Sequence, residues 1–127
     1  MPRLDAIGLV AADLAATLRF YRLLGVPFPE EGEGHVEAQL DGGLRLMVDT
    51  EAVVQSFSDW TPPAGGTPRT ALAFLCDDPA DVDATHAAVL DAGFASHVAP
   101  FDAPWGQRYA TVLDPDGNHV DLFAPLT

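Results

Sequence analysis

The feature that most constrains this chain is an order of elements that occurs twice. Each half begins with a short apolar stretch, residues 4–10 and 71–76, and continues with a segment of helical periodicity that ends at Gly25 or Gly93. Strand-like segments follow in both halves. Neither small unit can bury both faces of its own sheet. The repeat therefore predicts an α+β fold, in which two βαβββ modules form a curved mixed sheet with helices on the outer face and a concave ligand cleft.

A segment rich in proline and glycine separates the two halves. Residues 60–68 read WTPPAGGTP, which cannot extend a helix or a central strand. We expect one domain over residues 1–127, with module one at about 1–50, a linker at about 51–68 and module two at about 69–127. A short turn that holds Phe57 is expected ahead of the proline-rich part.

The first half has clear start and stop signals. Asp13 suits the N-cap of a helix over residues 14–24, whose leucines and Tyr21 recur at helical spacing, and Gly25 follows as its C′ residue. Alternating residues 35–40 predict a half-buried strand. The turn at residues 41–43 then leads into a second strand over residues 44–48, which completes a hairpin.

The second half has similar start and stop signals. Asp78 is a candidate N-cap, and Pro79 stands at the first helical position, where its missing N–H costs nothing. We expect the helix to bury Val82, Ala87, Val89 and Leu90. A short strand is expected at 94–99. Two further strands, 109–113 and 119–123, flank residues 114–117, which fit a type I turn.

Composition excludes some functions. There are 19 acidic residues against six basic ones, for a net charge of −13, which disfavours nucleic acid and attracts cationic ligands. No apolar run is long enough for a membrane helix and the N-terminus does not resemble a signal peptide, so we expect a cytoplasmic protein that does not associate with membranes. The one cysteine, Cys76, is expected to be a small buried side chain.

Two sets of motifs stand out: residues 4–7, 13–14, 20–21 and 24–25 near the start, and Trp105-Gly106, Arg108 and residues 114–118 near the end. They resemble the opening and the closing hairpin of the vicinal-oxygen-chelate superfamily, which includes glyoxalases, bleomycin resistance proteins and dioxygenases. The resemblance spans roughly 4–124. It implies either an enzyme or a binding protein, commonly a homodimer whose clefts combine parts of two chains.

The same resemblance would place a metal on inward-facing strand residues. Its ligands, usually histidine and glutamate, would fall at Ala6, Ala71 and Asp121, with a further one near Arg45 or Met47. Alanine offers no lone pair, and a single carboxylate does not hold a divalent ion against water. We therefore expect no metal, no cofactor and no catalytic residue.

Metal ligands at other positions are an alternative. His119 shares a strand face with Asp121, and His35 shares one with Glu37, so a relocated site remains an alternative. His86 is expected to be exposed on the second helix. His97 is placed in a strand or loop, without ligand spacing to another candidate.

The resemblance implies which alternate residues of each strand face the cleft. On that basis small residues line it, namely Ala6, Gly8, Ala71 and Ala73, so the expected cleft is wide. Tryptophans in the loops suit a flat ligand, and polar side chains of the same parity would orient it. Arg108 is expected to point to the other side of its strand, away from the cleft. The predicted ligand-binding residues are Trp60, Trp105, Tyr109, Thr111, His119, Asp121, Arg45, Met47, His35 and Phe57.

These features favour a protein that binds and sequesters a bulky, partly aromatic small molecule, such as an antibiotic, without a metal. The alternative is a metal-dependent lyase, isomerase or dioxygenase with relocated ligands. A metal-free enzyme with His119 or Asp121 as general base, and an interaction module without a small ligand, are weaker possibilities.

Overall fold

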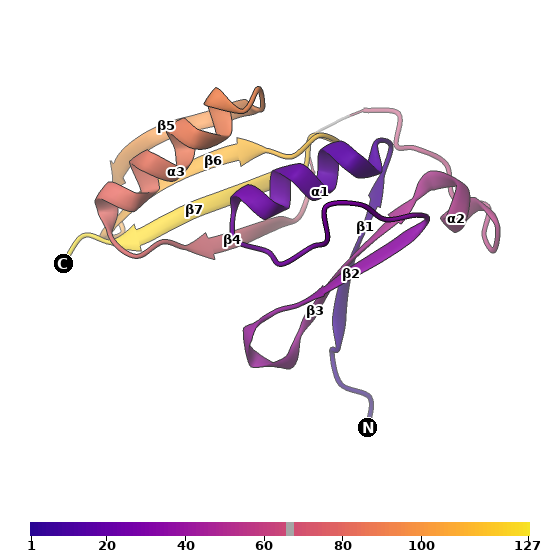
Figure 1. Ribbon diagram of the computed structural model, residues 1–127. Helices are drawn as coiled ribbons and strands as arrows, with labels where there is room; N and C mark the ends of the chain where they lie inside the picture. Colours follow the sequence, from indigo (N-terminus) through magenta and orange to yellow (C-terminus); the bar gives the residue numbers. More distant parts are fainter. Residues whose placement is uncertain (66–67) are drawn as a thin grey trace. The chain divides into compact units, whose positions relative to one another are not determined.

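The computed structural model describes residues 1–65 and 68–127, and the chain divides into two compact units, Met1–Gly66 and Thr67–Thr127 (Figure 1). The α+β class predicted from the sequence is confirmed. The elements of the first unit are β1 (Ala6–Ala11), α1 (Leu14–Leu23), β2 (His35–Gln39), the 3₁₀ turn η1 (Asp41–Gly43), β3 (Arg45–Thr50) and α2 (Glu51–Gln55). Those of the second are β4 (Ala71–Leu75), α3 (Pro79–Asp91), β5 (Ala95–Ala103), β6 (Gln107–Leu113) and β7 (His119–Pro125).

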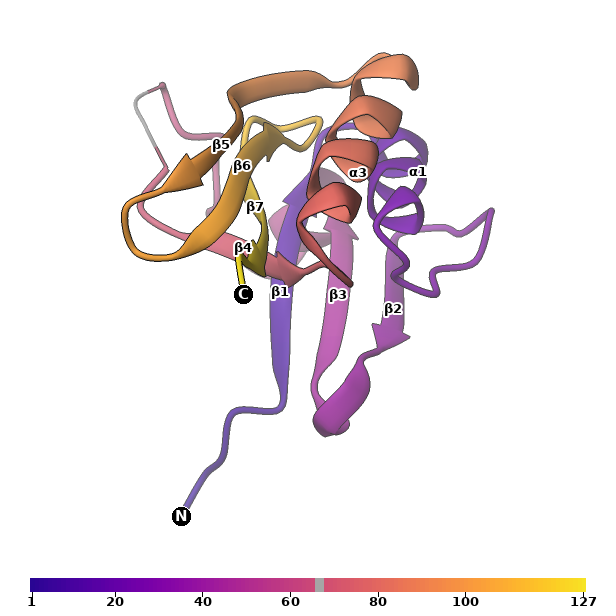
Figure 2. The same cartoon turned by 90° about the vertical axis from the view of Figure 1, so that its left-hand side faces the viewer.

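The first unit is a three-stranded mixed sheet in the order β1-β3-β2. Strand β1 runs parallel to β3, and β2 is antiparallel to it. Helix α1 packs on β3 and covers one face of this sheet (Figure 2). The side chains on the covered face are buried, namely Val36, Ala38, Leu46 and Val48.

Helix α1 begins and ends where its sequence predicts. The Asp13 side chain accepts a hydrogen bond from the Ala16 N–H at 3.0 Å, which satisfies one of the free donors of the first turn. Gly25, at φ 88°, then allows a Schellman ending, in which the Val26 N–H bonds to the Tyr21 carbonyl. Hydrogen bonds at both ends therefore fix where α1 begins and ends.

The second unit has the full βαβββ order. Its four strands lie in the order β4-β7-β6-β5, with β4 parallel to β7 and the other neighbours antiparallel. Helix α3 lies along one face of β5, β6 and β7 (Figure 2). Beneath it the core is closed by Ala110, Val112, Val120 and Leu122, all with no exposed surface.

Helix α3 starts as predicted but buries less than predicted. Asp78 caps it by accepting the Asp81 N–H at 2.8 Å, and Pro79 takes the first helical position. Val82 and Val89 are buried, whereas Ala87 and Leu90 are exposed. Residues 82 and 89 are about two turns apart and form one stripe, while Ala87 projects from the far side of the helix. The sheet accepts only that narrow stripe.

The connection between β6 and β7 is a β-turn at the residues where the sequence predicts one. The Gly117 N–H bonds to the Asp114 carbonyl at 2.9 Å, which closes four residues. The Asp114 side chain is buried and accepts hydrogen bonds from the backbone of Asp116 and Asn118. A carboxylate held by backbone donors fixes how the last two strands are joined.

Three elements differ from the sequence prediction. Helix α2 lies in the segment read as linker; Thr50 caps it by accepting the Val53 N–H at 3.2 Å, a signal hidden because the preceding strand runs directly into it. Phe57 does lie in a turn, just after this helix. In residues 1–65 the first module has three strands rather than four. Strand β5 is also longer than expected, because register shifts near Val98 let it continue to Ala103.

In the described parts of the chain, no helix has both the length and the apolar character that crossing a membrane requires.

Candidate functional site

The face of the second sheet that α3 leaves uncovered carries four of the ten predicted ligand-binding residues. Strand pairing orders this face in rows, because directly paired residues point to the same side. One row is Ala95, Leu113, His119 and Ala71; the next is Val98, Thr111, Asp121 and Ala73; a third is Phe101, Tyr109, Phe123 and Leu75. We call these residues the open face. The parity inferred for Ala71, Ala73, Tyr109, Thr111, His119 and Asp121 is thereby confirmed.

Asp121 is the fixed charge of the open face. The Tyr109 hydroxyl donates to its Oδ2 at 2.5 Å, and the Thr111 hydroxyl donates to its Oδ1 at 2.8 Å. Burial, together with the hydrogen bond to Asp121, raises the pKa of Tyr109 to about 12. Each carboxylate oxygen thus holds one hydroxyl donor and keeps acceptor capacity for another.

Aromatic rings border this carboxylate. Trp105 contacts Tyr109 edge-on, with ring centroids 5.4 Å apart, and Phe101 lies 6.1 Å from Trp105. Trp105 is 59% exposed, although its indole N–H donates to Gln107 Oε1 at 3.0 Å. Gly106, at φ 88°, makes the turn that presents this ring. We call Phe101, Trp105 and Tyr109 the aromatic wall. Phe101, which is not among the predicted ligand-binding residues, is a partly exposed member of the wall.

Arg108 points to the other side of the sheet, as its parity predicts. Its Nε and Nη2 atoms reach the two carboxylate oxygens of Asp83 on α3 at 2.9 and 3.1 Å, and Nη1 reaches Asp102 at 3.1 Å. A guanidinium held by two carboxylates joins helix to sheet. The Arg108 side chain is therefore paired with carboxylates on the sheet face away from the candidate site.

The ring of His97 reaches the open face, a contact that sequence reasoning missed. Its ring lies against that of His119, with centroids 4.5 Å apart and planes tilted by 30°. The expectation that His97 has no candidate partner is wrong, because a bulge in β5 turns it toward β7. His86 is half-buried rather than exposed, with Nε2 placed 2.8 Å from the Ser96 hydroxyl.

In the first unit the sheet face away from α1 carries an ionic network. Arg45 contacts Asp5 at 2.8 Å and Glu37 at 2.9 Å. The ring nitrogens of His35 lie 2.6 Å from Asp49 and 2.7 Å from Glu37. Hydrogen bonds with Glu37 and then Asp49 raise the pKa of His35. Arg45 and His35 are thus already paired within the protein.

The remaining predicted residues of the first unit are less tightly held. Met47 is half-buried on the same sheet face and lies beside Gly8. Phe57 is 74% exposed and Trp60 is half-buried, both beyond α2 and on no strand. Among the residues described, neither ring contacts another aromatic ring.

Cys76 follows β4 and is half-buried rather than fully buried. Burial raises the pKa of its thiol, which suppresses the nucleophilic thiolate. The expectation of a small structural side chain fits this setting better than a reactive one.

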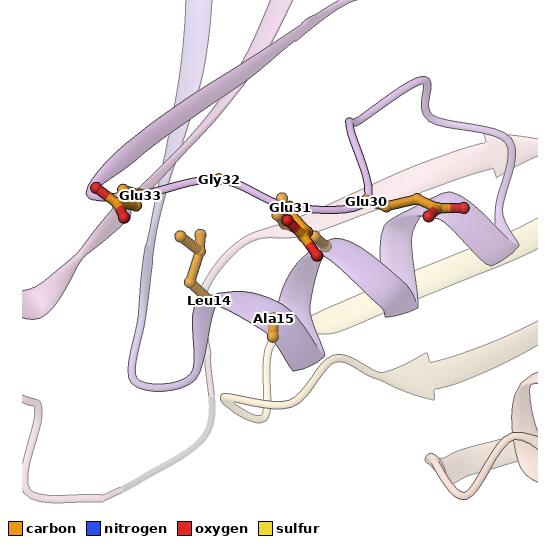
Figure 3. A pocket seen from close by; sticks show the side chains of 7 residues that line it. Leu14, Ala15, Glu30, Glu31, Gly32 and Glu33 are labelled. Carbon is orange, nitrogen blue, oxygen red and sulfur yellow. The ribbon is translucent and has the colours of Figure 1, made fainter.

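A separate cavity of about 470 Å³ lies in the first unit, between α1 and the loop that precedes β2 (Figure 3). It is lined by Leu14, Ala15, Leu18, Glu30, Glu31, Gly32 and Glu33. None of the ten predicted ligand-binding residues lines it.

The metal chemistry implied by the family does not fit this chain. Ala6 pairs with Arg45 and Ala71 pairs with His119, so both ligand positions hold methyl groups on their strands. Each carboxylate oxygen of Asp121 already accepts one hydrogen bond, Oδ2 from Tyr109 and Oδ1 from Thr111. Across residues 1–65 and 68–127 no group of three or more His, Cys, Asp or Glu side chains is placed to hold an ion.

Comparisons with known proteins agree with this fold. Residues 3–122 match the family model of the Glyoxalase/Bleomycin resistance protein/Dioxygenase superfamily, and the chain belongs to that superfamily. It is 32% identical over 126 residues to an uncharacterized protein of Mycobacterium bovis, which covers 93% of this chain and 80% of that protein.

Solved structures show the same fold. A glyoxalase-related enzyme from Fulvimarina pelagi is similar with a TM-score of 0.82 at 22% identity, over 98% of this chain and 88% of the other. A lactoylglutathione lyase from Agrobacterium tumefaciens is similar with a TM-score of 0.68 at 23% identity, over 96% and 92%. At this level of identity the likeness establishes the fold alone. The activity has to be inferred from the residues of this chain.

Proposed function

We propose that this protein binds and sequesters a bulky, partly aromatic small molecule on the open face of its second sheet, without the catalytic metal of its superfamily. The observation that carries the proposal is the exposed ring of Trp105 beside Tyr109, whose hydroxyl is bound to Asp121. A flat apolar ring and a fixed acceptor stand next to each other. That combination suits a ligand with a planar part and a hydrogen-bond donor.

Small side chains support the same proposal. Ala71 and Ala73 on β4 are exposed on the open face beside His119 and Asp121. Methyl groups at these positions leave room for a bulky ligand. Edge-on stacking against Trp105 would add roughly 0.5–1.5 kcal/mol beyond the burial of apolar area.

The ligand class and the assembly are part of the proposal. An antibiotic or other aromatic natural product would be held by stoichiometric burial in the cytoplasm, by a homodimer whose clefts are shared between chains. The net charge of −13 favours ligands without negative charge. Analytical ultracentrifugation with and without ligand tests the dimer.

The two tryptophans allow a sharp binding test. In Trp60→Phe the remaining emission reports Trp105, and in Trp105→Phe it reports Trp60. Titration with a panel of polycyclic aromatic antibiotics is expected to quench or shift emission in wild type and in Trp60→Phe, with saturation at one ligand per chain. Unchanged Trp105 emission across the whole panel would sink the proposal.

A further inference from the structure

We propose that His97 and His119 form a binding site for a late first-row divalent metal ion, such as Cu²⁺, Ni²⁺ or Zn²⁺, on the open face. Their rings come from two non-adjacent strands, β5 and β7, yet the centroids are only 4.5 Å apart. This site uses neither of the alanine positions at which the superfamily places its ligands. It is also separate from the aromatic wall, so the proposed ligand binding does not depend on it.

A break in strand pairing brings the two rings together. Ser96 pairs with Val112 and Val98 pairs with Thr111, which leaves His97 as an extra residue in β5. Such a bulge re-aims a side chain that regular alternation would send elsewhere. His119 pairs with Leu113 of β6, so the two imidazoles approach each other from the strands on either side of β6.

The ring nitrogens of this pair are available, in contrast to those of the other two histidines. His35 has both nitrogens against carboxylates, and Nε2 of His86 faces the Ser96 hydroxyl. In the described parts of the chain, His97 and His119 show only their mutual ring contact. A neutral imidazole carries one nitrogen lone pair that can bind a metal ion.

Imidazole nitrogen is a donor that copper, nickel and zinc prefer over magnesium and calcium. His97 is exposed and can turn about its side-chain bonds until both lone pairs converge on an ion about 2.0–2.1 Å from each nitrogen. Two imidazoles leave further coordination positions open. Water or an external ligand would fill them, because no third His, Cys, Asp or Glu in the described residues completes the group.

The test uses the full chain, purified with chelator and then dialysed free of it. Isothermal titration with Cu²⁺ and with Ni²⁺ is expected to show one ion per chain, and the Cu²⁺ electron paramagnetic resonance spectrum to show coupling to two imidazole nitrogens. His97→Ala and His119→Gln should each weaken binding by more than the ~10–100-fold that loss of a merely supporting partner costs. The matched controls His86→Ala and His35→Ala should leave binding unchanged.

Failure has a clear form. The proposal is overturned if wild type takes up neither ion, if His97→Ala binds as wild type does, or if a control variant loses as much affinity. Because His97 is an exposed residue, His97→Ala is expected to fold. Its far-ultraviolet circular dichroism and melting temperature establish that lost binding is not lost structure.

Discussion

The hydroxyl of Tyr109 on β6 donates to the carboxylate of Asp121 on β7 at 2.5 Å, and Thr111, directly paired with Asp121, donates to the other oxygen. Three side chains on two strands thus fix one negative charge in the middle of the open face. Its position and direction do not rely on a ligand, so an entering donor meets a preorganised acceptor.

Tyr109→Phe removes one donor and leaves the Asp121 oxygen short of a partner. We expect the free energy of unfolding to fall by about 1.5 kcal/mol, near the low end for bonds to a charged acceptor because the pair is only half-buried. Urea denaturation measures this. Ser56→Ala, which removes an exposed hydrogen bond from the hydroxyl to the Val53 carbonyl, serves as control and should change stability by less than about 0.5 kcal/mol. Equal losses in both variants would contradict the role given to the Tyr109 bond.

The Tyr109 bond also predicts alkaline behaviour. The folded pKa, about 12, lies above the unfolded value of about 10. The neutral phenol therefore stabilises the folded state fully below about pH 10, and this contribution is lost as pH rises from there through about 12. Stability measured against pH should fall over that window in wild type and less steeply in Tyr109→Phe. Absorbance at 295 nm should show one phenol fewer titrating at high pH in the variant.

His35 predicts a pH dependence near neutrality. Glu37 and Asp49 raise its folded pKa above the unfolded value of about 6.5. The stabilisation is fully present below the unfolded pKa and is lost as pH rises through the folded one. Proton NMR of the His35 ring should give a midpoint above 6.5 that drops in Asp49→Asn. A midpoint unaffected by that change would show that the carboxylate contact is not formed in solution.

Sequence reasoning located the faces of the sheets but not the pairs that meet on them. The family resemblance implied which residues face the cleft, and strand alternation then placed Tyr109, Thr111 and Asp121 on one side and Arg108 on the other. The contact of His97 with His119 depends on a bulge, and that of Arg45 with Asp5 on the parallel pairing of β1 with β3. Such contacts follow from long-range register, which one sequence does not reveal. The length of β5 was missed for the same reason.

Filling the open face tests the importance of its small residues. Ala73 is exposed and pairs with Asp121, so Ala73→Leu adds an isobutyl group beside the carboxylate without entering the core. We expect stability within about 0.5 kcal/mol of wild type, together with weaker aromatic-ligand binding in the fluorescence titration. Ala88→Leu, which adds the same group to an exposed position of α3, should leave binding unchanged. Undiminished binding in Ala73→Leu would show that the ligand does not bind on the open face.

The loop before β2 depends on one close approach. A Cβ at Gly32 would clash with Cγ2 of Val36, a buried side chain of β2. Gly32→Ala should therefore destabilise the protein by about 1–3 kcal/mol, the usual cost of forcing an extra methyl into a packed site. Because the clash involves one methyl group of Val36, Val36→Ala removes its cause. In a double-mutant cycle measured by urea denaturation, Gly32→Ala should cost much less in the Val36→Ala background than in wild type. Additive costs would show that Val36 is not what requires glycine at position 32.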